Sequence, residues 1–412
     1  MTKHPRHGPP APSVALVGIH GHGRSHLVRI LRSWTGGDLR LTALVDPRPL
    51  GPDAVDEVTA ASGAPTRDLA TDLATVPWYP DLGAMLAAGA APDVVVLCTP
   101  IHTHGPLATR ALQAGCDVLL EKPPAASLGE LDRLLAAESA TGRVVQVGFQ
   151  TFGSAALAAI DEIVAAGEIG ELTGVGAVGT WVRTTGYWTR SSWTGRRSLG
   201  GRPVVDGVVT NPLAHAVVTA LRLAGARTVD DVASVDLDQY RANPIEVDDT
   251  SVVRVTTSRG IPVTAALTLC AATQTTPHVT VQGSRGQVVL DYYADIVEVT
   301  GTAGIRTITA GRTDLLTNLL RHRSDPSVAL LCPLRDTGAF TRVLDAVRAG
   351  PDPTRIDPGH ITAVTDDTTT SDDGTHLVVR DVDRWCARAA AEHATFAELG
   401  APWARPAAGT AG

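Results

Sequence analysis

The chain has 412 residues, 44% of them hydrophobic and 19% charged, which is typical of a soluble globular protein with two domains. A net charge of −8, without blocks of Lys and Arg, argues against nucleic acid and anionic lipid as partners. The apolar runs are far shorter than the roughly 20 residues that span a bilayer, so no membrane partner is expected.

The cysteines and the N-terminus favour a cytoplasmic protein. The five cysteines are scattered, odd in number and without a CxxC pair, which is typical of reduced thiols. Residues Met1–Pro12 are basic and contain prolines but no apolar stretch. We therefore expect a disordered tail there, and neither a signal peptide nor an anchor.

Histidines are frequent in the first hundred or so residues, but the sequence predicts no metal site. Their spacing matches no tetrahedral pattern of His with Cys. The histidines concerned are His4, His7, His20, His22, His26, His102 and His104.

Residues 13–148 alternate short apolar runs with helical patterns, which predicts a doubly wound α/β domain with a parallel sheet. The expected strands are Val14–Gly18, Leu41–Asp46, Val94–Cys98, Asp117–Leu120 and Val144–Gly148, with a weaker one near Val76–Tyr79. The expected helices are Gly23–Trp34, Leu82–Ala88, Gly105–Ala114 and Leu128–Thr141.

A glycine-rich turn follows the first expected strand and opens a helix. Such glycines let the backbone come close to a pyrophosphate, while the N–H groups of the helix face the anion. His20 occupies the middle place of a G-x-G-x-x-G pattern, and Gly21 beside it supplies room. Such a turn can also exist without a ligand, but its position after a strand favours a dinucleotide. The residues expected to bind it are Gly18, His20, Gly21, His22 and Gly23.

Asp46 ends the second expected strand, 23 residues beyond Gly23. This is close to the spacing of the carboxylate that accepts a hydrogen bond from the ribose 2′-hydroxyl, which favours NAD over NADP. Arg48 could instead accommodate the NADP phosphate. Asp46 could also be only a turn residue before Pro47.

After Gly148 the pattern changes to that of an α+β domain, 149–412. The expected helices are Ala155–Ala166, Leu213–Leu223, Gly311–His322, Thr337–Ala349 and Asp381–Leu399. The expected strands are Thr173–Val182, Ser251–Thr256, Val263–Cys270, His278–Gln282 and Val288–Leu290. A loop rich in Trp, Arg and Gly covers 183–203, and Asp366–Gly374 is expected to be a polar loop.

Five motifs stand at the strand ends: GIHGHGRSHL (18–27), VVVLCTPIHTHGPLATRAL (94–112), AGCDVLLEKPPA (114–125), VVQVGF (144–149) and VQGSRGQVVL (281–290). Together they resemble the Gfo/Idh/MocA family, the glucose–fructose oxidoreductase and inositol dehydrogenase group. The resemblance is strongest over 13–148 and continues more loosely to about residue 350. It implies an N-terminal Rossmann domain followed by an α+β domain whose large open, mostly antiparallel sheet mediates homo-oligomers. It also implies an NAD(P)-dependent oxidoreductase that acts on sugars, cyclitols or related polyols.

The resemblance assigns roles to several residues around the glutamate–lysine–proline motif. Thr99, Pro100 and His104 would line the nicotinamide side, Glu121 would contact the cofactor, and Lys122 matches the catalytic lysine of the family. Proline ends the strand before it, so Glu121 and Lys122 stand at the carboxyl end of a parallel strand, where such sheets bind ligands. An alcohol dehydrogenase without a metal needs a group that orients the reacting oxygen and helps to move its proton. Lys122 is expected to do so with a depressed pKa.

A second catalytic group is expected at the start of the Leu213–Leu223 helix, where the family carries a D-x-x-x-H pattern. Alignment from the helix end puts His215 on the family histidine and Asn211 on the aspartate. Alignment from Gly200-Gly201 puts Asp206 on the aspartate and Thr210 on the histidine instead. We prefer the first, because Asn211 followed by Pro212 would form an N-cap and leave His215 in the first helical turn. There the helix dipole would favour a neutral imidazole beside Lys122 at the nicotinamide.

Aromatic and basic side chains in the 183–203 loop are expected to contact the substrate. Trp and Tyr faces stack on sugar rings, and arginines bind hydroxyl or acid groups. The same residue types also occur at subunit contacts. The substrate-binding set is Tyr187, Trp193, Arg196, Asp206, Asn211 and His215.

The sequence therefore predicts a dehydrogenase of CH–OH groups. Two alternatives stay open: a glycosidase or lyase that oxidises its substrate transiently, and a non-catalytic protein that senses dinucleotides.

Overall fold

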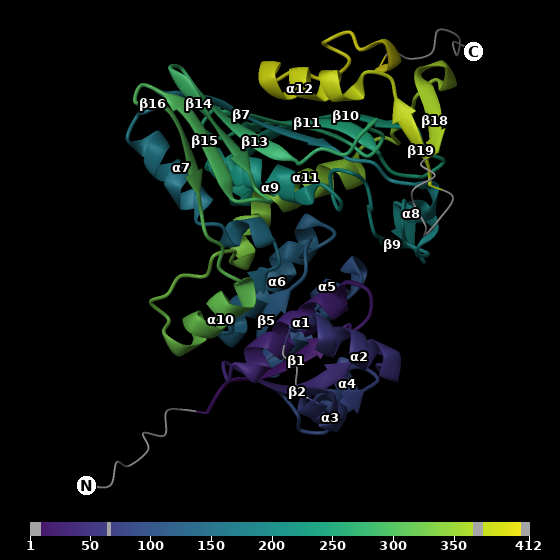
Figure 1. Ribbon diagram of the computed structural model, residues 1–412, viewed down its shortest axis with the longest axis vertical. Helices are drawn as coiled ribbons and strands as arrows, with labels where there is room; N and C mark the ends of the chain where they lie inside the picture. Colours follow the sequence, from purple (N-terminus) through teal and green to yellow (C-terminus); the bar gives the residue numbers. More distant parts are fainter. Residues whose placement is uncertain (1–9, 64–66, 366–373, 405–412) are drawn as a thin grey trace. The chain divides into compact units, whose positions relative to one another are not determined.

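The computed structural model describes residues 10–63, 67–365 and 374–404, which form two compact units (Figure 1). The first unit contains the chain up to Pro124, with Asp132–Gly148 and Leu316–Leu334. The second contains Ala125–Leu131, Phe149–Leu315 and the chain from Arg335 on. Most of the expected tail and of the expected polar loop at 366–374 lie outside the described residues. No helix in the described ranges combines the length and the apolar character needed to cross a bilayer.

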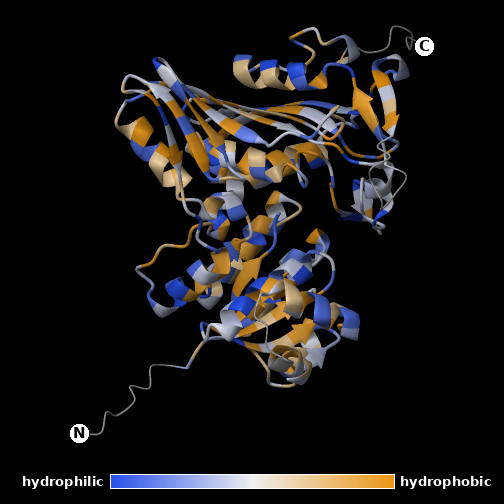
Figure 2. Ribbon diagram, viewed as in Figure 1, coloured by the Kyte–Doolittle hydropathy of each residue, from blue (hydrophilic) through white to orange (hydrophobic). Residues whose placement is uncertain are grey.

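The first unit is built on a parallel six-stranded sheet in the order β3-β2-β1-β4-β5-β6, which confirms the doubly wound prediction. Valine and leucine runs are buried on both faces of its central strands, as parallel sheets require, and these strands are orange in Figure 2. The strands are β1 Ser13–Val17, β2 Arg40–Val45, β3 Trp78–Tyr79, β4 Val94–Leu97, β5 Asp117–Leu120 and β6 Val145–Val147.

The helices between these strands are α1 His22–Thr35, α2 Pro52–Ala61, α3 Arg67–Thr75, α4 Leu82–Ala87, α5 His104–Gln113 and α6 Leu128–Thr141. The sequence prediction missed α2 and α3. The helix α2 begins with Gly51 as N-cap and Pro52 in its first turn, where proline needs no hydrogen-bond partner. It buries only Ala54 and Val58, so its apolar periodicity is weak.

The helix α10, Leu315–Ser324, belongs almost entirely to the first unit, although it follows most of the second. Its residue Arg323 forms ion pairs with Asp93 at 2.6 Å and Asp117 at 2.5 Å. Its residue Asn318 accepts a 2.8 Å hydrogen bond from the buried amide of Gln146 on β6. The helix was expected from Gly311. It begins four residues later because the preceding backbone pairs with the 153–154 segment of the second unit.

The second unit is built on a nine-stranded sheet in the order β16-β15-β14-β13-β7-β12-β11-β10-β17. Only the β7–β12 and β10–β17 pairs are parallel, so the predicted α+β class with a mostly antiparallel sheet is confirmed. The prediction missed β10, β15, β16 and the short β17. The strands are β7 Leu172–Thr180, β10 Val232–Arg241, β11 Thr250–Thr257, β12 Pro262–Thr268, β13 His278–Gly283, β14 Gly286–Asp291, β15 Ile296–Gly301, β16 Gly304–Thr309 and β17 Thr354–Arg355.

Helices cover both faces of this sheet (Figure 1). One face carries α9 Ala214–Leu223 and α11 Gly338–Ala349, while α7 Ala156–Ala165 packs near β15. The other face carries α12 Val382–Glu392, which packs on β7 and β12. A Cβ on Gly176 would lie 2.6 Å from the carbonyl oxygen of Ala390, so glycine on β7 lets α12 approach closely. Phe396 and Trp403 complete the hydrophobic core on this face.

The helix α12 is shorter than the predicted Asp381–Leu399. Its last residue is Glu392, and the C-cap residue His393 has a left-handed backbone with φ 51°. The ring of His393 lies within hydrogen-bond distance of Thr264 Oγ1 and Gln282 Oε1, on β12 and β13. These contacts with the sheet hold the residue where it stops the helix.

Candidate active site

The phosphate turn of the first unit has no room for side chains at its two outer glycines. A Cβ on Gly18, whose φ is 85°, would lie 2.1 Å from the carbonyl oxygen of Cys98. A Cβ on Gly23 would lie 1.9 Å from the carbonyl oxygen of Gly18. At Gly21, which has φ 54° and is the N-cap of α1, no atom lies within 4 Å of such a Cβ. Backbone atoms therefore crowd the turn at Gly18 and Gly23, whereas the space at Gly21 is open. This arrangement fits a dinucleotide pyrophosphate over the start of α1.

His20, Asp46 and Arg48 lie together beside this turn. Asp46 accepts hydrogen bonds from the backbone N–H of Ile19 at 3.2 Å and of Arg48 at 3.1 Å. The Nε2 atom of His20 lies 3.2 Å from the carbonyl oxygen of Arg48 and 3.8 Å from Asp46 Oδ1. Asp46 therefore joins the turn to the end of β2.

Glu121 is buried at the end of β5, between two histidines of α1. Its Oε1 atom lies 2.8 Å from His26 Nε2 and 3.6 Å from His22 Nε2. Its Oε2 atom accepts a 3.0 Å hydrogen bond from the backbone N–H of Lys122. Burial alone would raise the pKa of Glu121, but the hydrogen bonds from the two histidines outweigh burial and hold it well below its usual value. Glu121 is thus a buried carboxylate that keeps its charge.

His104 positions the loop that follows β4. It is 1% exposed, with Nδ1 2.8 Å from the carbonyl oxygen of Pro123 and Nε2 2.7 Å from that of Thr99. The side chains of Thr99 and Thr103 are hydrogen-bonded at 2.7 Å, and Pro100 between them is exposed. His104 therefore ties the Thr99–Thr103 turn to the segment that carries Lys122, which is half-buried.

In the second unit, Asp206 and Asn211 lie side by side, although the two alignments treated them as alternatives. The Oδ1 atom of Asp206 accepts a 2.5 Å hydrogen bond from the Asn211 amide, and its Oδ2 atom accepts one from the Gly195 backbone at 2.9 Å. Thr210 is 1% exposed and donates its hydroxyl to the carbonyl oxygen of Val205. The Thr210 hydroxyl therefore bonds to the backbone of its own loop.

The expected N-cap at Asn211 is wrong. The helix α9 begins at Ala214, and Leu213 is its N-cap residue. The Asn211 side-chain amide instead donates a hydrogen bond to Asp206, so it does not cap the helix. His215 is still in the first turn of α9, half-buried, with its ring 5.6 Å edge-on from that of Phe149.

The backbone next to Asp206 is in an unusual conformation. Val205 has φ 51°, which β-branched residues rarely adopt, and the Arg197 and Thr210 contacts hold it there. Buried behind it, Asp248 receives a hydrogen bond from Ser251, and a Cβ on Gly207 would lie 1.8 Å from Asp248 Oδ1. Burial raises the pKa of Asp248. The sequence analysis missed this supporting carboxylate, which lies 42 residues from Asp206 along the chain.

Tyr187 of helix α8, Thr185–Thr189, is stacked between arginines. The Arg190 guanidinium lies 3.5 Å from the centre of its ring and 5.3 Å from that of Trp193. Arg183, which the sequence analysis did not single out, lies 5.0 Å from the Tyr187 ring. Burial raises the pKa of Tyr187, and the charge of Asp206 raises it further. Tyr187, Trp193, Arg190 and Arg183 thus form one cation–π cluster close to Asp206.

The other arginines of this loop are engaged elsewhere. Arg196 is exposed and forms a 3.1 Å ion pair with Glu246. Arg197 donates hydrogen bonds to carbonyl oxygens in the last turn of α11 and just after it, at Val347, Arg348, Gly350 and Pro351. Arg197 therefore anchors the loop, while Arg183 and Arg190 carry its aromatic contacts.

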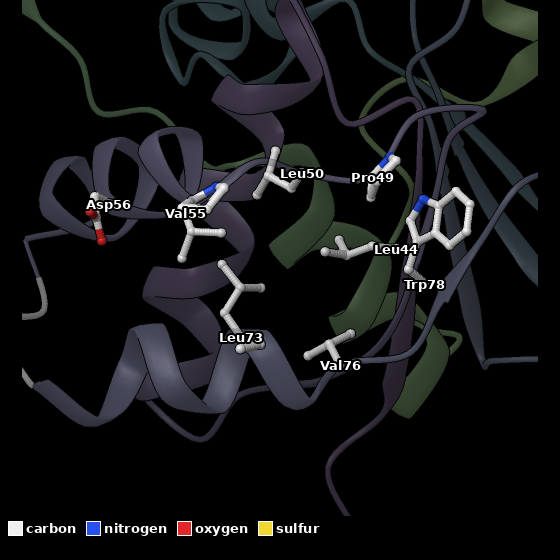
Figure 3. Close-up of a pocket in the computed structure, with 10 residues that line it drawn as sticks. Leu44, Pro49, Leu50, Val55, Asp56, Leu73, Val76 and Trp78 are labelled. Atoms are coloured by element: carbon white, nitrogen blue, oxygen red, sulfur yellow. The ribbon is translucent and has the colours of Figure 1, made fainter.

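A cavity of about 410 Å³ lies in the first unit between β2, β3, α2 and α3 (Figure 3). Its lining is almost entirely apolar, and Asp56 is the one charged residue in it. None of the predicted site residues lines it. The lining residues are Leu44, Pro49, Leu50, Pro52, Val55, Asp56, Leu73, Ala74, Val76 and Trp78.

The predicted site residues thus form two groups, one in each unit. The cofactor group, with Lys122, gathers around the phosphate turn and the ends of β2, β4 and β5. The substrate group, with His215, gathers around the loop before α9.

Both halves of the chain match models of one family. Residues 13–149 match the "Oxidoreductase family, NAD-binding Rossmann fold" model, and residues 157–289 match the "GFO/IDH/MocA C-terminal domain" model. Inositol 2-dehydrogenase 4 of Saccharopolyspora erythraea is 36% identical over 137 residues, which is 33% of this chain and 36% of that protein. A putative UDP-kanosamine synthase oxidoreductase subunit of Amycolatopsis mediterranei is 30% identical over 47% of each chain. This chain therefore spans less than half the length of the curated relatives it matches.

The fold likeness extends further than these alignments. The WlbA dehydrogenase of Bordetella pertussis, solved with NADH and UDP-GlcNAcA, matches 82% of this chain and 95% of its own with a TM-score of 0.62 at 22% identity. This comparison supports the two-domain fold alone. The two family models together cover most of the chain and include its NAD-binding domain. The chain belongs to the Gfo/Idh/MocA oxidoreductase family.

Proposed function

We propose that this protein is an NAD-dependent dehydrogenase that transfers a hydride between the nicotinamide and a CH–OH group of a sugar, cyclitol or related polyol. The observation that carries the proposal is the identity of residue 122. The chain has 35 basic residues, of which only Lys3 and Lys122 are lysines, so 33 are arginines. A lysine stands at the strand end next to a buried, charged Glu121, in a chain that otherwise uses arginine. Lysine can lose its proton when its pKa is depressed, whereas arginine stays charged.

In this proposal each residue has one task. Bound NAD supplies the hydride acceptor. Lys122 orients the reacting oxygen by a hydrogen bond, and His215 accepts the hydroxyl proton. The ionised Glu121 holds the backbone of residue 122 through its Oε2 atom. Asp46 receives the ribose hydroxyls, which favours NAD over NADP.

The substrate residues of the proposal are those of the second unit. Tyr187 and Trp193 present faces for a sugar ring, and Arg183 and Arg190 add positive charge beside them. Asp206 and Asn211 offer a carboxylate and an amide to hydroxyl groups. The indole N–H of Trp188 is buried without a hydrogen-bond partner in the described part of the chain, and a substrate oxygen would satisfy it. One relative named above is an inositol dehydrogenase, and the WlbA dehydrogenase was solved with a nucleotide sugar. Both ligands agree with this substrate class.

The test combines a substrate panel with one substitution at each of two positions. The wild type is expected to reduce NAD with at least one cyclitol or sugar. We expect Lys122→Arg, which keeps the charge but cannot exchange the proton, to lower kcat at least about tenfold, and His215→Asn to do the same. NAD binding, measured separately by fluorescence quenching, should stay within about threefold for Lys122→Arg.

Unchanged kcat in both variants would contradict the acid–base assignment. Tight NAD binding without turnover on the whole panel would favour a dinucleotide sensor. Substrate cleavage without net NADH would favour a glycosidase or lyase. A cytoplasmic homo-oligomer is proposed as well, and light scattering of the purified protein tests the oligomer. Because α12 packs on β7 and β12, the proposed contact with a second copy lies outside this part of the sheet.

A further inference from the structure

We propose that His22, His26 and Glu121 bind one divalent transition-metal ion of the zinc class. The two histidines are four residues apart on α1, and this spacing puts both rings on one face of a helix. Glu121 reaches the same point from the end of β5, and all three ligand atoms lie within 4.8 Å of one another. This inference does not depend on the proposed dehydrogenase activity.

The distances suit a zinc-sized ion after small shifts. Tetrahedral zinc with bonds of about 2.0–2.1 Å to nitrogen and oxygen separates its ligand atoms by about 3.3 Å. Glu121 Oε1 lies 2.8 Å from His26 Nε2 and 3.6 Å from His22 Nε2, so these two separations lie on either side of that value. The two histidine nitrogens lie within 4.8 Å of each other, so the His26 contact would have to open and the exposed His22 ring would have to turn toward the ion.

The charge of the cluster favours a cation. Glu121 is buried, and its ion-pair partners in the described residues are these two histidines. A negative charge buried in a medium of low dielectric constant is unfavourable unless a cation compensates it. A divalent ion would neutralise this charge and add bonds to both rings.

The surroundings supply the other requirements of a metal site. The backbone N–H of Lys122 donates to Glu121 Oε2 at 3.0 Å and so fixes the orientation of the carboxylate, as outer contacts do in metal sites. The His22 side chain is 59% exposed, which gives an ion a path from solvent. The fourth position would be open to water or to an anion at the start of α1.

The ligand set also selects the metal. Two imidazole nitrogens and one carboxylate oxygen suit zinc, nickel or cobalt, whereas magnesium and calcium require oxygen ligands. We assign no reaction to the ion. Its expected effect is to cross-link the first helix to β5 in the first unit.

The test is a zinc competition titration of the full-length protein against a chromogenic chelator. We expect one site in the wild type, and an affinity at least about tenfold lower in His22→Gln, His26→Gln and Glu121→Gln. His20→Gln removes a histidine from the same turn but outside the cluster, so the affinity should be unchanged. Zinc should raise the Tm of the wild type and leave that of His22→Gln unaltered. Cobalt bound to the wild type should show the visible absorption of a nitrogen-ligated, low-coordinate site.

His22 is exposed, so its variant should fold even if the two buried positions do not tolerate substitution. Equal zinc affinity in the wild type and His22→Gln would overturn the proposal, as would the lack of any competitive site. Loss of the site in a His4→Gln, His7→Gln double variant, with His22→Gln unaffected, would assign the metal to the N-terminal segment and also overturn it.

Discussion

Gly23 is the residue where the space in the phosphate turn is smallest. In the middle of a helix, exchange of glycine for alanine normally stabilises a protein by about 1 kcal/mol. Here the added Cβ would lie 1.9 Å from the carbonyl oxygen of Gly18, which is backbone and cannot swing away. We expect Gly23→Ala to destabilise the protein by about 1–3 kcal/mol despite the better helix propensity.

The consequence for the cofactor follows from the same clash. We expect Gly23→Ala to weaken NAD binding at least about tenfold, measured by isothermal titration, because the turn must open. Gly51→Ala is the matched control: it is also at a helix start, has φ −75°, and has no atom within 4 Å of the new Cβ. Its stability and NAD affinity should match the wild type. A Gly23 variant that behaves like the Gly51 variant would show that the turn is not rigid.

Because of His393, at the end of α12, the stability of the protein is expected to depend on pH. Burial lowers the pKa of His393 below the ordinary value of 6.5, and the charge of Arg254 lowers it further. Below pH 6.5 the unfolded chain therefore binds a proton that the folded chain does not, so stability is lost as the pH falls. Glu398, which pairs with Arg254, has a pKa below 4.5, so its own contribution is lost only at lower pH.

We expect the urea midpoint of the wild type to fall between pH 7.5 and 5.5 by more than that of His393→Asn. Asparagine tolerates the left-handed backbone at this position but does not titrate, so the variant removes the proton without forcing the helix to end elsewhere. If the urea midpoints of the two proteins depend on pH in the same way, groups other than His393 cause the loss of stability.

The elements differ in how well the sequence predicts them, for physical reasons. The central strands of the first sheet are buried on both faces, so an unbroken apolar run identifies them. The N-cap of α9 was predicted wrongly because Asn211 is a good N-cap by residue type, yet its amide donates a hydrogen bond to Asp206. The cluster at Glu121 was missed because its histidines lie 95 and 99 positions earlier in the chain, and local spacing does not report such contacts. The same limit explains why Asp248, 42 residues from Asp206, was not singled out.

At the scale of the whole molecule, α10 completes the first unit from a distant part of the chain. Arg323 lies between Asp93 and Asp117, which is 8% exposed. We expect Arg323→Gln to destabilise the protein by about 1–3 kcal/mol, because it leaves two neighbouring carboxylates without a cation. Urea unfolding measures the change, and Arg321→Gln, an exposed position on the same helix, should have an effect below about 0.5 kcal/mol. Equal changes in stability for the two variants would mean that the ion pairs of Arg323 do not stabilise the protein.

The place of α10 in the chain also affects biosynthesis. A ribosome releases residues 316–334 only after the strands from β7 to β16 have been translated, although those residues belong to the first unit. Folding from the N-terminus during synthesis therefore cannot finish the nucleotide-binding unit first. Until then the Gln146 amide lacks Asn318, and the carboxylates of Asp93 and Asp117 have no guanidinium between them. A gene fragment that encodes only residues 13–148 would leave the nascent sheet in that incomplete state.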